Sequence, residues 1–183
     1  MEAVDKRTSI RKFKDKKVNF SDVLEAIDAA LKTPLAGNIS TLKFVIITDP
    51  DTKEKIAEYA DQLWLADADT LVVVCSKMEQ LERMYKERAR DYAKQQVGAA
   101  IQNFLLRITE LGLASCWVGA YLDHEIKNVL TIPGEIVIEA ILPVGHPDEK
   151  PKPKKKISLE HAIYCDKWKQ SKKPTLTKDP ATR

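Results

Sequence analysis

The hydrophobic pattern of the chain alternates between helical spacing and short apolar runs. In "SDVLEAIDAALKT", apolar residues recur every three or four positions after Ser21, a plausible N-cap, and the pattern stops before Pro34. From residue 79 to residue 111 there is no proline and no break other than Gly98, and Gly112 follows where a helix end often needs positive φ. The pattern therefore predicts helices over residues 21–33, 52–63, 79–111 and 124–130.

Four other stretches have the β-branched and apolar character of strands. "DTLVVVCS" is almost continuously apolar, as is typical of a strand buried on both faces. The strands are expected within residues 43–50, 69–76, 114–121 and 135–145. Helices that flank and alternate with about four strands indicate one mixed sheet, and no internal repeat or interdomain linker interrupts them.

Composition limits the class of protein. A chain of 183 residues with 44% hydrophobic residues is long enough for one domain with a full core. No run of 18 apolar residues is present and the N-terminus is charged from Glu2 onward, so neither a membrane span nor a secretory signal is indicated. We therefore expect a cytoplasmic enzyme or binding protein.

Charge is distributed unevenly along the chain. The net charge is +3, but residues 146–183 hold 11 Lys and Arg against 5 Asp and Glu, so the preceding part is acidic overall. This weakens nucleic acid binding as the main function, because a binding domain is expected to carry its cations on the folded body. We expect a folded domain over residues 1–149 and a Pro- and Lys-rich arm over 150–183 that packs on a partner subunit.

The usual signatures of metal binding and of side-chain catalysis are missing. Three widely spaced cysteines form no CxxC pair, and three histidines form no HxxxH or HExxH pattern, so no metal site is predicted. There is no GxGxxG after a strand, no GxxxxGK[ST] and no GxSxG, and no carboxylate pair stands out as an acid–base dyad. We therefore expect no catalytic side chain, and a bound cofactor would carry the reactive chemistry.

Three motifs point to that cofactor. "RTSIRKF" at residues 7–13, "PLAGN" at 34–38 and "LGLASCWVGAY" at 111–121 resemble, in this order, the nitroreductase family of FMN-dependent oxidoreductases. The resemblance continues into "ILPVGHPDEKPKPKKK", residues 141–156. It implies an α+β fold with a central mixed, mostly antiparallel sheet flanked by helices. It also implies a homodimer whose two flavin sites lie at the interface.

The first motif is expected to hold the FMN phosphate and one edge of the ring. The phosphate dianion needs cations and hydroxyl or N–H donors, which Arg7 and Ser9 offer. By resemblance, Arg11 approaches flavin N1 and O2, where a cation stabilises the reduced anion, and Thr8 supplies a backbone or hydroxyl contact. Without the other motifs, the stretch would be the solvated basic end of an N-terminal helix.

The second motif is expected to contribute a tight turn. Gly37 would take an unusual backbone angle, and the Asn38 amide would contact the flavin ring or ribityl chain. After Asn38 the family usually continues with Gln, Pro and an aromatic residue, whereas this chain has "ISTL". Gln62 stands about where relatives place a polar residue that reaches the pyrimidine edge, although a solvated helix-end glutamine is a close alternative.

The third motif is expected to run along the isoalloxazine. The resemblance implies that a backbone N–H near Gly119 donates to flavin N5, while Trp117 and Val118 form an apolar wall. Cys116 is interpreted as a small buried hydrophobe and not as a redox thiol. A basic residue after the last strand would reach the phosphate, and the candidates are Lys154, Lys155 and Lys156, with a solvated charge run as the alternative.

The predicted function is that of a homodimeric FMN oxidoreductase. It would pass hydride from NAD(P)H through flavin N5 to a nitroaromatic, a quinone or a similar conjugated acceptor, in a ping-pong cycle. The segment from Met78 to Tyr92, with Met84 and Tyr85, is the candidate cover of the pocket, and core or dimer packing is its alternative role. A flavin-binding or electron-transfer module, or an anion-binding protein that uses its basic tail, is the alternative function.

Overall fold

The computed structural model describes residues 2–150 and 156–170. The chain divides into two compact units, residues 1–151 and 152–183. The helices of the first unit are α1 (Glu2–Lys6), α2 (Phe20–Leu31), α3 (Pro50–Tyr59), α4 (Glu79–Tyr85), α5 (Ala89–Glu110) and α6 (Asp123–Leu130). Single 3₁₀ turns are η1 (Ala36–Asn38), η2 (Leu63–Leu65) and η3 (Lys86–Arg88).

One four-stranded sheet forms the centre of this unit. Its strands are β1 (Leu42–Ile47), β2 (Thr70–Lys77), β3 (Ala114–Ser115) and β4 (Ile136–Gly145), in the spatial order β1-β2-β4-β3. Every pair of neighbouring strands is antiparallel, and one isolated parallel bridge joins Ser9 to Ser115. The predicted α+β architecture with a mostly antiparallel sheet is confirmed.

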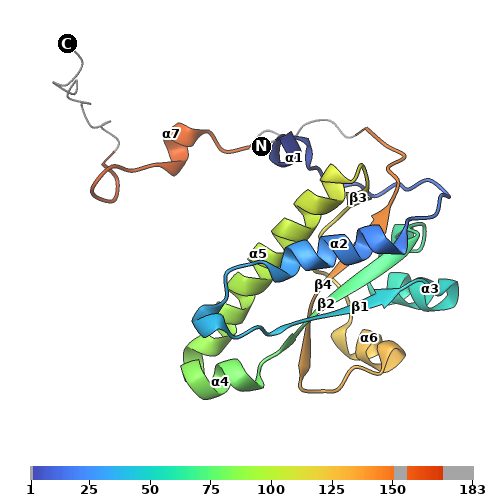
Figure 1. The fold of residues 1–183 in the computed structure, drawn as a ribbon, viewed down its shortest axis with the longest axis horizontal. Helices are drawn as coiled ribbons and strands as arrows, with labels where there is room; N and C mark the ends of the chain where they lie inside the picture. The colour runs from blue at the N-terminus through green and yellow to red at the C-terminus, as the bar shows by residue number, and fades with distance from the viewer. Residues whose placement is uncertain (1, 151–155, 171–183) are drawn as a thin grey trace, which may run out of the picture. The chain divides into compact units, whose positions relative to one another are not determined.

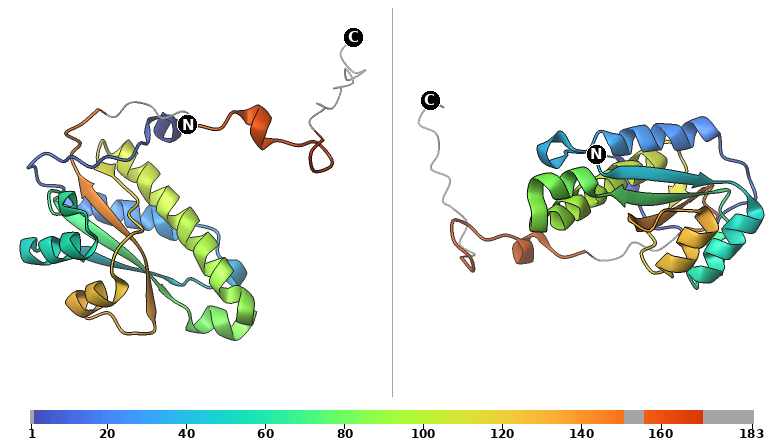
Figure 2. Two further views of the ribbon diagram at one scale, coloured as in Figure 1. Left: turned by 180° about the vertical axis from the view of Figure 1, so that it is seen from behind. Right: turned by 90° about the horizontal axis from the view of Figure 1, so that it is seen from below.

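Helices cover both faces of the sheet (Figures 1 and 2). On one face, α2 and α5 pack together over alternate residues of β2 and β4, with Phe104 fully buried between them. On the other face, α3 and α6 pack against the remaining residues of the same strands through Ile56 and Ile126. Both faces of β2 are therefore covered, which explains its continuous run of apolar residues.

Two predicted elements have different limits in the structure. The expected helix over residues 79–111 is wrong as one element, because Lys86 has φ 47° and ψ −122° and separates α4 from α5. The break lets α4 turn back, so that Leu81 packs against Ala89 and Ala93. The expected strand over residues 114–121 is only two residues long as a regular strand, and Val118 rejoins the sheet through a single bridge to Ile141.

Helix ends differ from the prediction in smaller ways. The cap of α2 is Asn19 and not Ser21, and α3 begins at Pro50 with Asp49 accepting the Thr52 N–H at 2.9 Å. The Asp-Pro step is thus the start of a helix, where proline is favoured in the first turn. Gly112 has φ 72°, as the sequence predicted.

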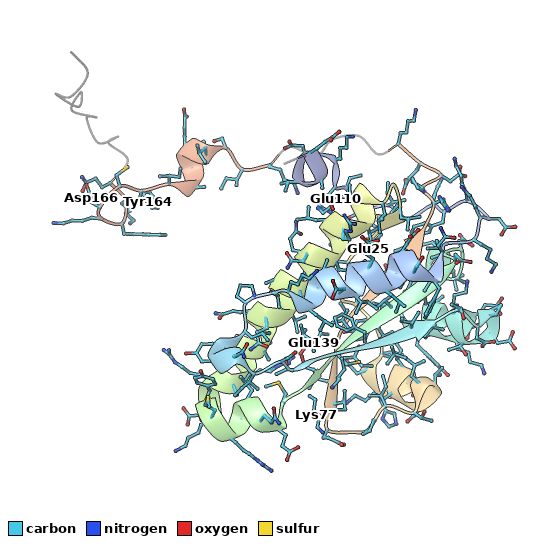
Figure 3. The ribbon with its side chains drawn as sticks, viewed as in Figure 1. Glu25, Lys77, Glu110, Glu139, Tyr164 and Asp166 are labelled. Carbon is cyan, nitrogen blue, oxygen red and sulfur yellow. The ribbon has the colours of Figure 1, made fainter. Side chains whose placement is uncertain are left out.

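A partly buried ion pair joins the sheet to the start of α5. Opposite the junction of Val74 and Cys75, β4 carries one extra residue, so the register shifts there at Glu139. The side chain of Glu139 is 8% exposed and accepts from Arg90 at 2.5 and 3.2 Å in a bidentate pair. Figure 3 labels Glu139 in the interior, between α5 and the strands.

Residues 156–170 contain one short helix, α7 (Leu159–Ala162). Tyr164 and Trp168 pack against each other with ring centroids 4.6 Å apart. Several large apolar side chains of this unit are exposed, among them Ile157, Leu159 and Trp168. Within the parts of the chain that the structure describes, no helix combines the length and the apolar character needed to cross a membrane.

Candidate functional site

The first and third motifs lie side by side. The segment after α1 runs along β3, where the Ile10 N–H donates to the Ser115 carbonyl at 3.1 Å beside the Ser9–Ser115 bridge. It continues along the chain that follows β4, where the Lys14 N–H donates to the His146 carbonyl at 2.9 Å. Residues 7–14 are therefore fixed on the same sheet edge from which residues 116–121 continue.

Two arginines on this segment are available for an anion. Arg7 and Ser9 are half-buried, while Thr8 and Arg11 are exposed. Neither guanidinium has a carboxylate partner within residues 2–150 and 156–170. Because an arginine without a carboxylate partner keeps its fork of donors free, Arg7 and Arg11 can bind an anionic ligand.

Arg11 is also oriented by its neighbours. Its guanidinium carbon lies 5.8 Å from the centroid of the Trp64 ring, and its backbone N–H donates to Glu149 Oε1 at 2.5 Å. Trp64 in turn stacks on Phe13, with ring centroids 6.5 Å apart. The position of Trp64 beside the cation was not predicted, since an apolar residue before a buried strand gives no such signal.

The third motif presents an open backbone edge. Val118 exchanges two hydrogen bonds with Ile141, at 3.1 and 3.0 Å, and is buried. Gly119 is exposed, a Cβ there would meet no atom within 4 Å, and its N–H has no acceptor among the described residues. A flat ligand can therefore approach it closely.

Two further predicted residues border this edge. Trp117 is 44% exposed, and its ring lies 4.0 Å from the position that a Cβ on Gly98 of α5 would take. The Gln62 side-chain nitrogen donates to the Ala120 carbonyl at 3.4 Å. The structure thus gathers seven of the predicted residues along one edge: Arg7, Thr8, Ser9, Arg11, Gln62, Val118 and Gly119, with Trp117 beside them.

The second motif lies at the other end of α5. The Ala36–Asn38 turn packs near Gln96, in the first half of α5, whereas α1 packs beside Thr109 and Glu110 at its end (Figure 1). Thr109 stands thirteen positions after Gln96 in the helix, which is about 20 Å. Within one chain, the structure therefore does not bring Gly37 and Asn38 together with Arg7.

The turn itself has the predicted unusual backbone. Gly37 and Asn38 have φ of 58° and 57°, in the left-handed region. A Cβ on Gly37 would stand 2.6 Å from the Tyr85 hydroxyl and 3.1 Å from Met84 Sδ, so a larger residue would displace these side chains, and the positive φ also favours glycine. Asn38 is exposed.

The candidate cover lies at the same end as this turn. Tyr85 and Tyr92 meet edge to face with centroids 4.9 Å apart, and both contact the cluster formed by Met78, Leu81, Ala89 and Ala93. Met84 is 58% exposed. Tyr85 and Tyr92 are therefore held by packing, whereas Met84 is open to a ligand or to a second chain.

The basic candidates after β4 are only partly described. Lys156 is exposed and belongs to the second unit. Lys154 and Lys155 lie outside the described residues.

Possible metal ligands and Cys116 were also considered in the sequence. The described ranges contain no group of three or more His, Cys, Asp or Glu side chains that could hold a metal ion. Cys116 is buried beside Trp117, as expected of a small hydrophobe.

Cys75 gives the protein a predicted alkaline sensitivity. Burial, together with the charge of Glu139, raises the pKa of the Cys75 thiol from 9.0 to about 11. Between these pH values the folded protein keeps a proton that the unfolded chain releases. The free energy of unfolding should therefore fall as pH rises through this window, by up to about 3 kcal/mol. Urea titrations at pH 8.5 to 11 should show a shallower fall in a Cys75→Ala variant, and parallel curves would contradict the assignment.

Comparison with known proteins identifies the fold and the family. The model of the nitroreductase family matches residues 4–79 and 58–146. A relative from Archaeoglobus fulgidus, named provisionally as an NADH dehydrogenase/NAD(P)H nitroreductase, is 31% identical over 150 residues, which cover 79% of this chain and 83% of the relative.

Solved structures of similar fold support the same assignment. A BluB-like flavoprotein from Clostridium difficile is 29% identical, with a TM-score of 0.79 over 91% of this chain and 98% of the other. An FMN-dependent nitroreductase from the same species, 23% identical, has the same fold, with a TM-score of 0.78 over 91% of this chain and 98% of the other. The ordered motifs, the sheet and these matches together show that the chain belongs to the nitroreductase family.

Proposed function

We propose that this protein is an FMN-dependent oxidoreductase that transfers hydride from NAD(P)H to a nitroaromatic, a quinone or a similar conjugated acceptor. The observation that carries the proposal is the shared sheet edge. Arg7, Ser9 and Arg11 offer free cationic and hydroxyl donors there, beside the open N–H of Gly119. This donor set fits a flat ring with an anionic tail, such as FMN. Membership of the nitroreductase family, and the relative whose name includes NAD(P)H nitroreductase, support FMN as cofactor and NAD(P)H as hydride donor.

The separation of the motifs supports a homodimer. Because Asn38 lies about 20 Å along α5 from the Arg7 end, the Asn38 turn of a second copy would complete each site. Two such sites would then lie at one interface. The exposed apolar side chains of residues 156–170 favour the proposal that the arm packs on that second copy. Cross-linking and sedimentation would measure the assembly.

Each residue of the edge has a distinct role in the proposal. Arg7 and Ser9 bind the phosphate, with one of the basic residues after β4 as a further donor. Gln62 reaches the pyrimidine edge, Thr8 adds a polar contact, and Trp117 and Val118 form an apolar wall. When bound, FMN supplies the ring that accepts hydride at N5 and passes it on. The Gly119 N–H orients that ring, and no side chain needs to act as a nucleophile.

Arg11 is expected to set the reduction potential. A cation near flavin N1 and O2 favours the reduced, anionic ring, so Arg11→Ala should lower the potential of bound flavin by about 30–60 mV. Lys12→Ala is the matched control, because Lys12 is also an exposed cation on the same segment. Dye-equilibrium titration of flavin-loaded protein measures both potentials. An unchanged potential in Arg11→Ala would remove this role.

A kinetic assay separates turnover from simple flavin binding. Steady consumption of NADH or NADPH with an added quinone, with parallel double-reciprocal plots, is expected for the ping-pong oxidoreductase. Retained flavin without such consumption would instead identify a flavin-binding or electron-transfer module. A cytoplasmic location is part of the proposal and would be tested by cell fractionation.

A further inference from the structure

We infer that Gln96 is a positioning residue that holds the Ala36–Asn38 turn in the shape needed for Asn38 to bind FMN. The inference rests on the proposed function and adds to it a residue that lies outside all three motifs. Gln96 is on α5, about 60 residues after the turn, and no local pattern connects the two.

The Gln96 side chain makes two hydrogen bonds to the backbone, one on each side of Gly37 and Asn38. Gln96 is only 3% exposed, and its amide reaches the turn from α5. In the amide orientation that pairs both of its ends, its nitrogen donates to the carbonyl oxygen of Ile39, the residue after the turn, at 3.2 Å, and its oxygen accepts from the Ala36 N–H at 3.2 Å. The two contacts bracket Gly37 and Asn38, so the backbone on both sides of the ligand-binding residue is fixed.

The turn needs such support because of its backbone. Asn38 is not a glycine, yet it follows Gly37 with positive φ, and such conformations persist where surrounding structure holds them. Hydrogen bonds within the turn hold only part of its backbone. The Asn38 N–H donates to the Leu35 carbonyl at 3.2 Å, and the Ile39 N–H donates to the Ala36 carbonyl at 3.1 Å. The Gln96 amide satisfies the outward groups that these bonds leave.

Asn38 itself is left free by this arrangement. It is exposed, and its side chain makes no hydrogen bond within the described part of the chain. A fixed backbone that carries a free amide loses little entropy when a ligand binds. Removing the two Gln96 hydrogen bonds should therefore reduce the affinity for FMN, although Gln96 itself does not touch FMN.

The first test compares two neighbouring glutamines. Gln96→Met keeps the length of the side chain and removes both hydrogen bonds, while Gln95→Met changes an exposed residue of the same helix turn. We expect Gln96→Met to raise the dissociation constant for FMN about tenfold and Gln95→Met to change it less than about twofold. Fluorescence titration at a temperature well below the melting point of each variant measures both constants.

The second test uses protonation of a glutamate at position 96 to restore both hydrogen bonds. In Gln96→Glu, the ionised carboxylate can accept from Ala36 but cannot donate to Ile39. The protonated acid has both a donor and an acceptor, as glutamine does. The dissociation constant for FMN, divided by the wild-type value at the same pH, should therefore fall toward one as pH is lowered from 8 to 5. This series remains informative if Gln96→Met fails to fold.

The outcomes separate the inference from the proposed function. Wild-type affinity in Gln96→Met, or a lower melting temperature with an unchanged dissociation constant, would overturn the positioning role and leave a purely structural one. A pH-independent ratio in Gln96→Glu would overturn it as well. If the wild-type protein itself binds no FMN, the proposed function fails first, and the variants are not needed to show it.

Discussion

Arg7→Ala should weaken FMN binding by about 100-fold. A charge-assisted hydrogen bond between a guanidinium and a phosphate contributes at least about 1.5 kcal/mol, and alanine removes a pair of them, a loss of about 3 kcal/mol. Arg7 is half-buried at the end of α1, so its position is fixed before the ligand arrives. No carboxylate within the described residues neutralises it. Fluorescence titration of the apoprotein with FMN measures the loss.

The adjacent residue gives the matched control. Lys6 is also a cation on this stretch, but it forms an exposed ion pair with Glu2 one helical turn away. Lys6→Ala should therefore leave the FMN dissociation constant within about twofold of wild type. Equal losses in the two variants would mean that general positive charge attracts the ligand and that Arg7 makes no specific contact.

Arg90→Met should destabilise the folded protein by about 3 kcal/mol. The substitution leaves the Glu139 carboxylate, only 8% exposed, without its bidentate partner, and an unpaired buried charge is costly. The expected loss of stability is at the lower end of the usual range, because the Arg90 side chain is 40% exposed. Urea denaturation followed by circular dichroism gives the free energy of unfolding.

Two controls test the cause of this loss. Arg83→Met breaks an exposed pair with Glu79 one turn apart on α4 and should cost only about 0.5 kcal/mol. The double variant Arg90→Met/Glu139→Gln removes the unpaired charge, so it should recover part of the stability that Arg90→Met loses. A double variant less stable than Arg90→Met would contradict the account.

The sequence predicts the framework well where the signal is local. Helical spacing identified α2, all but the first two residues of α3 and the whole of α5, and the continuous apolar run identified β2 as a strand covered on both faces. These features depend on side chains that each element carries itself. The break at Lys86 could not be predicted, because lysine has no preference for positive φ and tertiary packing of Leu81 decides the turn.

In the candidate site, too, local motifs could be predicted and contacts between distant segments could not. The motifs indicated which residues to examine, and the structure places most of them on one edge. The distance of Asn38 from that edge depends on the length of α5, which no single motif contains. The neighbours Trp64 and Gln96 were missed because their contacts join segments far apart in the sequence.

The most direct test of the account is the visible absorption spectrum of the purified protein after addition of FMN and removal of the excess by gel filtration. The flavin bands are expected to elute with the protein, at one FMN per chain, in a peak with the size of a dimer. A colourless protein that does not retain FMN would contradict the central claim, and the shared edge of Arg7 and Gly119 would then serve another ligand.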